Sequence, residues 1–210
     1  MKAIIFDLDG VIVHTDNYHY KAWKKLADRL NLPFDEEKNN RLRGVSRMES
    51  LEIILEDSEY ALADLSVKTA YAEEKNETYK EYLNTMSPAD LAPEVLSTLN
   101  TLRERSILMA IGSSSKNAQL ILDKIGLGDF FDAISDGNNI TNSKPDPEVF
   151  LKAAEYLNLK NTDCIVVEDA DAGIEAAHRA GMKAIAMGDA VNYGNGDWNI
   201  ASFAEILDVV

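Results

Sequence analysis

The sequence has little of three things: cysteine, positive charge and long apolar runs. Its single cysteine, Cys164, excludes an intramolecular disulfide and fits a reducing compartment. The 21 basic residues are outnumbered by 36 acidic ones, which gives a formal net charge of -15. Nucleic acids and anionic membrane surfaces are held by clustered cations, so this charge argues against both as partners. No run approaches about 18 apolar residues, and we therefore expect a soluble, cytoplasmic protein.

Short apolar runs are present, and from residue 89 onward they alternate with stretches of helical periodicity. The runs cover 107–112, 132–135, 163–169 and 183–188, and the opening run 3–6 has the same character. They show no polar alternation, which is typical of strands buried on both faces of a parallel sheet. Gly126 and Gly181 stand where two of the intervening helices would end. The pattern predicts an α/β fold, a Rossmann-like doubly wound parallel sheet.

Residues 15–87 interrupt that pattern with helical periodicity alone. Trp23, Leu26 and Leu30 share one helical stripe, and a charged, tyrosine-bearing helix is expected around residues 70–83. We therefore expect an inserted α-helical cap domain over residues 15–87 and a discontinuous α/β core from 1–14 and 88–210. No low-complexity linker separates the two, so the hinges near Thr15 and Ser87 must be short.

Polar side chains follow several of the predicted strands. Asp7 and Asp9 end the first strand, a serine run begins at Ser113, and Glu168 and Asp169 end the 163–169 strand. Each group also has an ordinary structural interpretation that needs no ligand. The aspartates could form a solvated turn, the serines a helix N-cap, and the acidic pair a cap of the next helix. Ligands of open parallel sheets bind beyond the carboxyl ends of the strands. Four carboxylates gathered there would repel one another unless a cation such as Mg²⁺ neutralised them.

Four short motifs in this order resemble those of the haloacid dehalogenase superfamily of phosphotransferases. They are "DLDG", "IGSSS", "SKPDP" and "VVEDADAGI", and the resemblance covers essentially the whole chain. It implies that Asp7 is the nucleophile that accepts a phosphoryl group and that Asp9 is the general acid/base. It further implies that Ser113 and Lys144 hold the oxygens of the transferring group. The metal set implied for Mg²⁺ is Asp7, the backbone carbonyl of Asp9, Glu168 and Asp169.

The inserted segment resembles, within that superfamily, the cap of the β-phosphoglucomutase family. The stretches that carry the resemblance are "HTDNYHYKAWKKLA" and "RLRGVSRMESLEIIL". The substrate-binding positions implied in the cap are Thr15, His19, Trp23, Arg43, Gly44, Val45, Ser46, Arg47, Ser50 and Lys75. Those implied in the core are Ser114, Ser115, Lys116 and Asn117.

These cap residues also have ordinary alternatives. Trp23 fits the apolar stripe as a core residue, and His19 could be a helix-surface histidine. Arg43 and Arg47 are spaced as on a solvated helix face. Against that alternative, Arg41, Arg43 and Arg47 form a basic island in an acidic chain, which indicates an anionic ligand such as phosphate.

The resemblance implies an enzyme that interconverts β-D-glucose 1-phosphate and glucose 6-phosphate. The route would pass through an aspartyl phosphate and a bound 1,6-bisphosphate, with Mg²⁺ as cofactor. A sugar-phosphate phosphatase is the alternative, in which water attacks the aspartyl phosphate. A non-enzymatic sensor of phosphorylated metabolites would not need Asp7, Asp9 and Lys144, all of which are present. We expect a monomer whose only partners are sugar phosphates.

Overall fold

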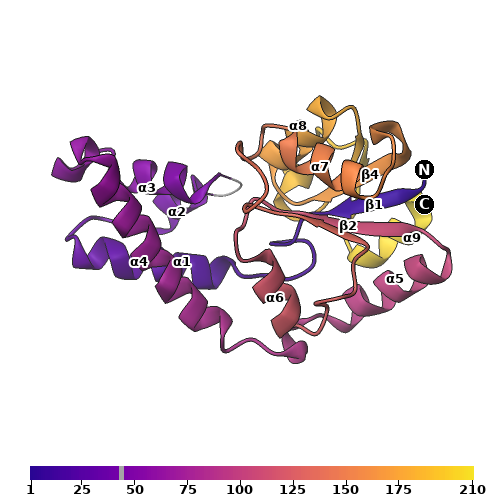
Figure 1. The fold of residues 1–210 in the computed structure, drawn as a ribbon, viewed down its shortest axis with the longest axis horizontal. Coiled ribbons are helices and arrows are strands. Elements are labelled where there is room, and N and C mark those ends of the chain that lie inside the picture. Colours follow the sequence, from indigo (N-terminus) through magenta and orange to yellow (C-terminus); the bar gives the residue numbers. More distant parts are fainter. Residues whose placement is uncertain (43–44) are drawn as a thin grey trace. The chain divides into compact units, whose positions relative to one another are not determined.

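A computed structural model describes residues 1–42 and 45–210 of the chain. The chain forms two compact units (Figure 1). An α/β unit consists of Met1–His14 and Met86–Val210, and a helical unit consists of Thr15–Thr85. Within the described residues, no helix combines the length and the apolar character needed to cross a membrane.

The α/β unit is built on one parallel sheet of six strands in the order β3-β2-β1-β4-β5-β6. The strands are β1 (Ala3–Phe6), β2 (Leu108–Gly112), β3 (Ala133–Ser135), β4 (Cys164–Glu168), β5 (Lys183–Ala186) and β6 (Trp198–Asn199). Phe6 lies beside Ile111 of β2 and beside Val167 of β4, so β1 is central and the three strands end almost level. This register brings the residues that follow β1, β2 and β4 to one edge of the sheet.

Helices cover both faces of this sheet. They are α5 (Pro93–Glu104), α6 (Ala118–Lys124), α7 (Glu148–Tyr156), α8 (Asp171–Arg179) and α9 (Ile206–Val209). Short 3₁₀ turns lie at η2 (Pro88–Asp90), η3 (Asn161–Asp163), η4 (Gly188–Tyr193) and η5 (Phe203–Glu205). α7 and α8 lie on one face, and α5 and α9 lie on the other (Figure 1). The expected α/β fold with a parallel sheet and a helical insertion is confirmed.

Burial on both faces explains why apolar and polar residues do not alternate along the strands. All four residues of β1 and all five of β4 are buried, because side chains on both faces meet helices. Phe150 of α7 and Ile174 of α8 pack with Ile5 and Val166 of the sheet in one apolar cluster. The two-residue strand β6 was not predicted, since so short a segment has no periodicity to detect.

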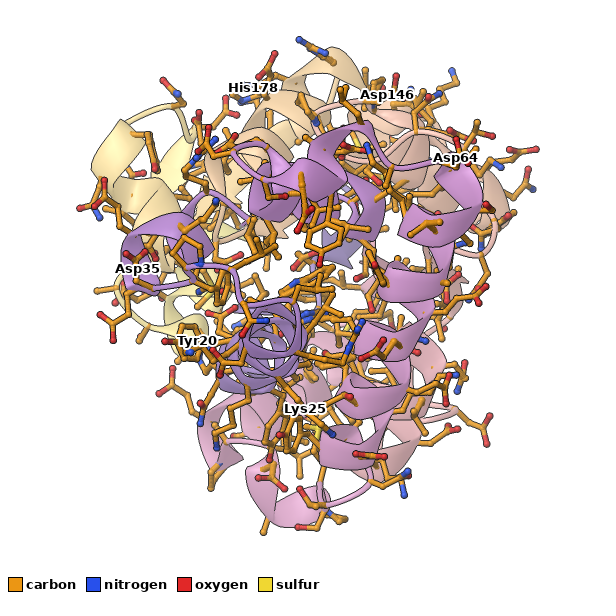
Figure 2. All side chains as sticks on the ribbon, turned by 90° about the vertical axis from the view of Figure 1, so that its left-hand side faces the viewer. Tyr20, Lys25, Asp35, Asp64, Asp146 and His178 are labelled. Atoms are coloured by element: carbon orange, nitrogen blue, oxygen red, sulfur yellow. The ribbon has the colours of Figure 1, made fainter. Side chains whose placement is uncertain are left out.

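The helical unit has its own core. Its elements are α1 (Asp16–Arg29), α2 (Glu36–Asn40), α3 (Arg47–Leu55), η1 (Glu59–Leu62) and α4 (Leu65–Leu83). The predicted stripe of Trp23, Leu26 and Leu30 is buried in that core. Tyr20 and Lys25 of α1 differ in environment (Figure 2): the Tyr20 ring lies 5.6 Å from that of Phe34, whereas Lys25 is exposed. No described residue of the unit belongs to a strand.

Candidate active site

The acidic edge of the α/β unit is formed by the ends of β1 and β4. Asp7 follows β1, and its backbone N–H donates to the Val167 carbonyl at 2.9 Å, so the β1–β4 pairing extends to it. Glu168 is the last residue of β4 and is 1% exposed. Gly10 has a φ of +83°, and a Cβ there would collide with the Asp169 carboxylate. Glycine therefore lets the turn after β1 lie directly against Asp169.

Lys144 joins the two strand ends. Its ammonium lies 2.5 Å from Asp7 Oδ1 and forms a second ion pair with Glu168 Oε1. Its side chain is 3% exposed, and its Nζ lies 4.9 Å from the centre of the Phe150 ring. The Lys144–Pro145 peptide bond is cis. The structure thus brings together three of the residues that the motifs singled out, across sequence separations of 137 and 24 residues.

The carboxylates of Asp7, Glu168 and Asp169 form a group suited to a metal ion. One ligand oxygen from each lies within 4.8 Å of the others. When all three carboxylates are ionised, the one ammonium leaves two negative charges, which is the charge that a divalent cation would balance. Oxygen donors are the ligands that hard divalent cations prefer. The Asp9 carboxylate is outside this group, and the expected role of its backbone carbonyl stays a prediction.

Burial and charge shift the pKa values of this cluster. Burial raises the pKa of the Asp7 carboxyl to about 7; the Lys144 ammonium opposes this rise, and the charges of Glu168 and Asp9 add to it. Burial alone would lower the pKa of Lys144, but the charges of Asp7 and Glu168 raise it above its ordinary value. Lys144 therefore stays a cation at any physiological pH. A bound divalent cation would favour the ionised form of Asp7.

Glu168 also organises the start of α8. Its Oε2 accepts hydrogen bonds from the backbone N–H groups of Asp169 at 3.0 Å and Ala170 at 3.1 Å. Both N–H groups precede α8, which begins at Asp171, so Glu168 holds the turn that leads into the helix and does not cap it as the alternative interpretation held. The other oxygen pairs with Lys144, so the carboxylate is held from two sides.

The serine loop after β2 continues the same edge. Ser113 is 3% exposed, and its Oγ accepts from the Ser115 N–H at 3.2 Å. Ser115 Oγ accepts from the N–H of Asn117, the N-cap residue of α6, at 3.1 Å. The Ser114 hydroxyl is buried and has no hydrogen-bond partner among the described residues. Lys116 is exposed.

In the helical unit, α1 and α4 bring four predicted residues together. Lys75 is 3% exposed, and a 2.8 Å hydrogen bond joins its Nζ to His19 Nδ1. That Nζ also lies 4.6 Å from the Trp23 ring centre, in a cation–π contact. Thr15 Oγ1 shares a 2.7 Å hydrogen bond with the hydroxyl of Tyr79, and the Tyr79 ring stacks on His19 at 4.0 Å. Trp23 therefore belongs to the core, as its alternative interpretation held, and also covers the Lys75 ammonium.

Tyr79 was missed by the sequence analysis. It lies one helical turn beyond Lys75 on α4 and contacts Thr15, His19 and Lys75. Its spacing of four residues from Lys75 was a signal that could have found it.

The structure describes two of the three arginines of the predicted basic island, Arg41 and Arg47, and their surroundings differ. Arg41 forms two hydrogen bonds with the Glu56 carboxylate, at 2.5 and 2.8 Å, so its charge is already compensated. Arg43 and Gly44 lie outside the described residues. Arg47 is partly buried at the start of α3, and within the described chain its guanidinium makes no hydrogen bond or ion pair. Burial lowers the pKa of Arg47, with Tyr79, Glu73 and Glu77 opposing that effect.

The remaining predicted cap residues lie around this arginine in the sequence. Ser46 caps α3: its Oγ accepts from the Glu49 N–H at 3.2 Å, while the Glu49 carboxylate accepts from the Ser46 N–H at 2.8 Å. Val45 is partly buried, and Ser50 is 4% exposed within α3. A capping box fixes the direction from which the chain enters the helix, and Arg47 is the first residue after it.

Comparisons with known proteins agree with the geometry of the acidic edge. A family model described as haloacid dehalogenase-like hydrolase matches residues 4–187. A β-phosphoglucomutase of Bacillus subtilis is 42% identical over 192 residues, which are 90% of this chain and 84% of that protein. A fructose-1-phosphate phosphatase of Escherichia coli is 34% identical over 184 residues, 87% of this chain and 94% of that one. A crystal structure of β-phosphoglucomutase from Clostridium difficile superposes with a TM-score of 0.93 at 38% identity, covering 98% of this chain and 93% of that chain.

The matched range includes every residue of the acidic edge. The chain belongs to the haloacid dehalogenase-like hydrolase family.

Proposed function

We propose that this protein is a Mg²⁺-dependent β-phosphoglucomutase that interconverts β-D-glucose 1-phosphate and glucose 6-phosphate. The observation that carries the proposal is Arg47, a partly buried cation of the helical unit without a described hydrogen bond or ion pair. A mutase must bind two phosphates, one that is transferred and one that is not. The acidic edge serves the first, and Arg47 serves the second.

The chemistry at the acidic edge is phosphoryl transfer through Asp7. An Asp7 carboxylate oxygen attacks phosphorus, the bond from phosphorus to the sugar oxygen breaks, and an aspartyl phosphate forms. Asp9 gives a proton to the departing oxygen and takes one from the hydroxyl that attacks in the reverse direction. Lys144 and Ser113 hold the oxygens of the transferring group. A divalent cation held by Asp7, Glu168 and Asp169 would supply charge neutralisation between the two anions.

The helical unit supplies the second phosphate contact. Arginine binds phosphate through two parallel hydrogen bonds. The other two described arginines of this unit are already paired, Arg29 with Glu74 and Arg41 with Glu56. Binding energy from a phosphate that does not react can then be used to drive transfer at the other end of the sugar.

A phosphorus NMR time course tests this proposal. With Mg²⁺ and a trace of bisphosphate primer, β-glucose 1-phosphate should go mainly to glucose 6-phosphate, with little inorganic phosphate. Arg47→Ala should lower kcat/KM by about 10²–10³, because a buried charge-assisted contact is worth about 3–4 kcal/mol. Hydrolysis of the aspartyl phosphate should change far less.

Arg41→Ala is the matched control, since it removes an exposed arginine whose charge Glu56 already balances. We expect its kcat/KM to stay within about 3-fold of the wild-type value. If the wild-type protein released inorganic phosphate as its main product, the alternative function of sugar-phosphate phosphatase would replace the mutase. The similarity to the Escherichia coli phosphatase makes that the second candidate.

A further inference from the structure

The loop that follows β3 lies directly against the serine loop that follows β2. The pairing of the two strands continues past their ends: Ser113 N–H donates to the Ser135 carbonyl at 3.0 Å, and Gly137 N–H donates to the Ser115 carbonyl at 3.1 Å. The β3 loop therefore contacts the backbone of residues on which the proposed function depends, although none of its own residues belongs to a recognised motif.

Asn138 provides the side-chain link between the two loops. Its Nδ2 donates to the carbonyl of Lys116 at 3.0 Å and to Asp136 Oδ2 at 3.0 Å. Its backbone N–H donates to the other oxygen of Asp136 at 2.9 Å. Asp136 is 6% exposed, and both of its carboxylate oxygens accept hydrogen bonds that orient Asn138.

Only glycine fits at position 137, between the loop that follows β2 and the loop that follows β3. A Cβ at this position would lie 2.5 Å from the Ser114 carbonyl oxygen and 3.0 Å from the Lys116 backbone nitrogen. Both are backbone atoms, which cannot rotate away as a side chain would. Any larger residue would push the two loops apart.

We propose that Asp136, Gly137 and Asn138 form a positioning element that sets the course of the Ser114–Lys116 backbone. The element acts through this loop on Ser115, Lys116 and Asn117, which are three of the four core residues expected to bind the sugar phosphate, the fourth being Ser114. This inference rests on the proposed function for its kinetic part only. Its structural part concerns the unliganded protein and is independent of the reaction.

Asn138→Ala is the test variant, because Asn138 is exposed and its truncation opens no cavity. Amide hydrogen exchange, read on the unliganded protein, should become faster across residues 113–117. kcat/KM for β-glucose 1-phosphate should fall by about 3- to 10-fold, the range for loss of a single hydrogen bond. The loss should lie mainly in KM. Aspartyl phosphate formation from acetyl phosphate uses the acidic edge with its cation, Ser113 and Lys144 but no sugar contact, so its rate should change less than about 2-fold.

Asn161→Ala is the matched control. Its Nδ2 also donates to a backbone carbonyl at 3.0 Å, that of Ala180, but from a turn that precedes β4. We expect neither faster exchange at residues 113–117 nor a change in KM. Asn138→Asp keeps the shape of the side chain but replaces its amide donor with a carboxylate that faces Asp136 Oδ2 and the Lys116 carbonyl, so its effects should be at least as large as those of Asn138→Ala.

Unchanged exchange at residues 113–117 in Asn138→Ala would overturn the proposal. Equal losses with acetyl phosphate and with the sugar phosphate would also overturn it, as would wild-type behaviour of Asn138→Asp. Release of inorganic phosphate by the wild-type protein would instead overturn the proposed function and leave the exchange result as it stands.

Discussion

Lys144 is the residue on which the electrostatics of the acidic edge depends. Without a metal ion, its ammonium is the one cation paired with Asp7 and Glu168 within the described residues. Breaking a buried ion pair by removing one partner costs about 3–5 kcal/mol, because the other charge is left buried without compensation. The site is therefore held in its geometry before any ligand arrives, which suits stabilisation of a transferring phosphoryl group.

Asp7→Asn should abolish turnover while the protein remains folded. Burial raises the pKa of Asp7 to about 7, whereas aspartates of an unfolded chain titrate near pH ~4. As the pH rises from about 4 to about 7, the unfolded state binds fewer protons than the folded state, and the metal-free protein loses stability. Asparagine does not titrate, so the Tm of the variant relative to wild type should increase from about pH 5 to about pH 8.

Thermal unfolding in metal-free buffer over this pH range measures the effect. A Tm difference that shrank as the pH rose would contradict the raised pKa of Asp7. Residual turnover above about a hundredth of the wild-type rate would contradict its assignment as the nucleophile.

Asp9→Asn separates the two aspartates by function. Acetyl phosphate has a good leaving group and needs no proton donor, so this variant should still form the aspartyl phosphate from it. Turnover of sugar phosphates should fall by about 10²–10⁴, the usual contribution of a general acid/base. Rapid-quench measurement of phosphorylated protein with both donors provides the comparison, and equal losses with both would argue against an acid/base role.

At the scale of elements, the start of α8 sets the position of Glu168. Gly173 lies in the first turn of α8, and a Cβ there would overlap the Glu168 carboxylate. The helix and the Glu168 carboxylate, a candidate metal ligand, are thus packed so closely that only glycine fits between them. Glycine at position 173 is a poor helix former, but it allows α8 to pack against the Glu168 carboxylate.

Gly173→Ala should therefore weaken metal binding even though alanine is the better helix former. Glu168 must leave Lys144 or the N–H groups of Asp169 and Ala170 to make room for the methyl group. We expect at least about a 10-fold loss of Mg²⁺ affinity by isothermal titration calorimetry, in line with displaced metal ligands or their supports. Gly128→Ala is the control, since its Cβ would meet only the Asp123 side chain near the end of α6. Equal affinity of the two variants would refute the packing argument.

At the scale of the whole molecule, two units with separate cores carry the two groups of candidate residues. A mutase must keep water from its aspartyl phosphate until a sugar arrives, and closure of one unit over the other is a general means of excluding it. We expect the helical unit to close over the strand ends through the short hinges predicted near Thr15 and Ser87.

Small-angle X-ray scattering measures this closure. With Mg²⁺, glucose 6-phosphate and a phosphate analogue, the radius of gyration should be smaller than with Mg²⁺ alone. Arg47→Ala should show less of this decrease, whereas Arg41→Ala should show all of it. Identical scattering curves with and without the ligands would contradict the model.

The parallel sheet and the location of the acidic edge could be predicted from the sequence. Apolar runs without alternating polar residues identify strands that are buried on both faces. If these strands are parallel, the polar residues that follow them must lie at one edge of the sheet. Asp7, Ser113 and Glu168 were found in this way, whereas Lys144 was found through the resemblance of the SKPDP motif. The helical insertion could also be predicted from the sequence, because Trp23, Leu26 and Leu30 recur at the helical period and form one apolar stripe.

Only the tertiary structure decided which of these side chains meet. The double ion pair of Lys144 depends on the pairing of β1 with β4, which sets Asp7 beside Glu168, and on the segment before α7 that carries Lys144 to both. These contacts join residues 137 and 24 positions apart. Sequence proximity also misled: Arg41 and Arg47 are six positions apart, yet Glu56 pairs with Arg41 alone among the described arginines. The reason is physical, since periodicity determines which face a residue occupies, whereas partners across elements are determined by packing that no local pattern records.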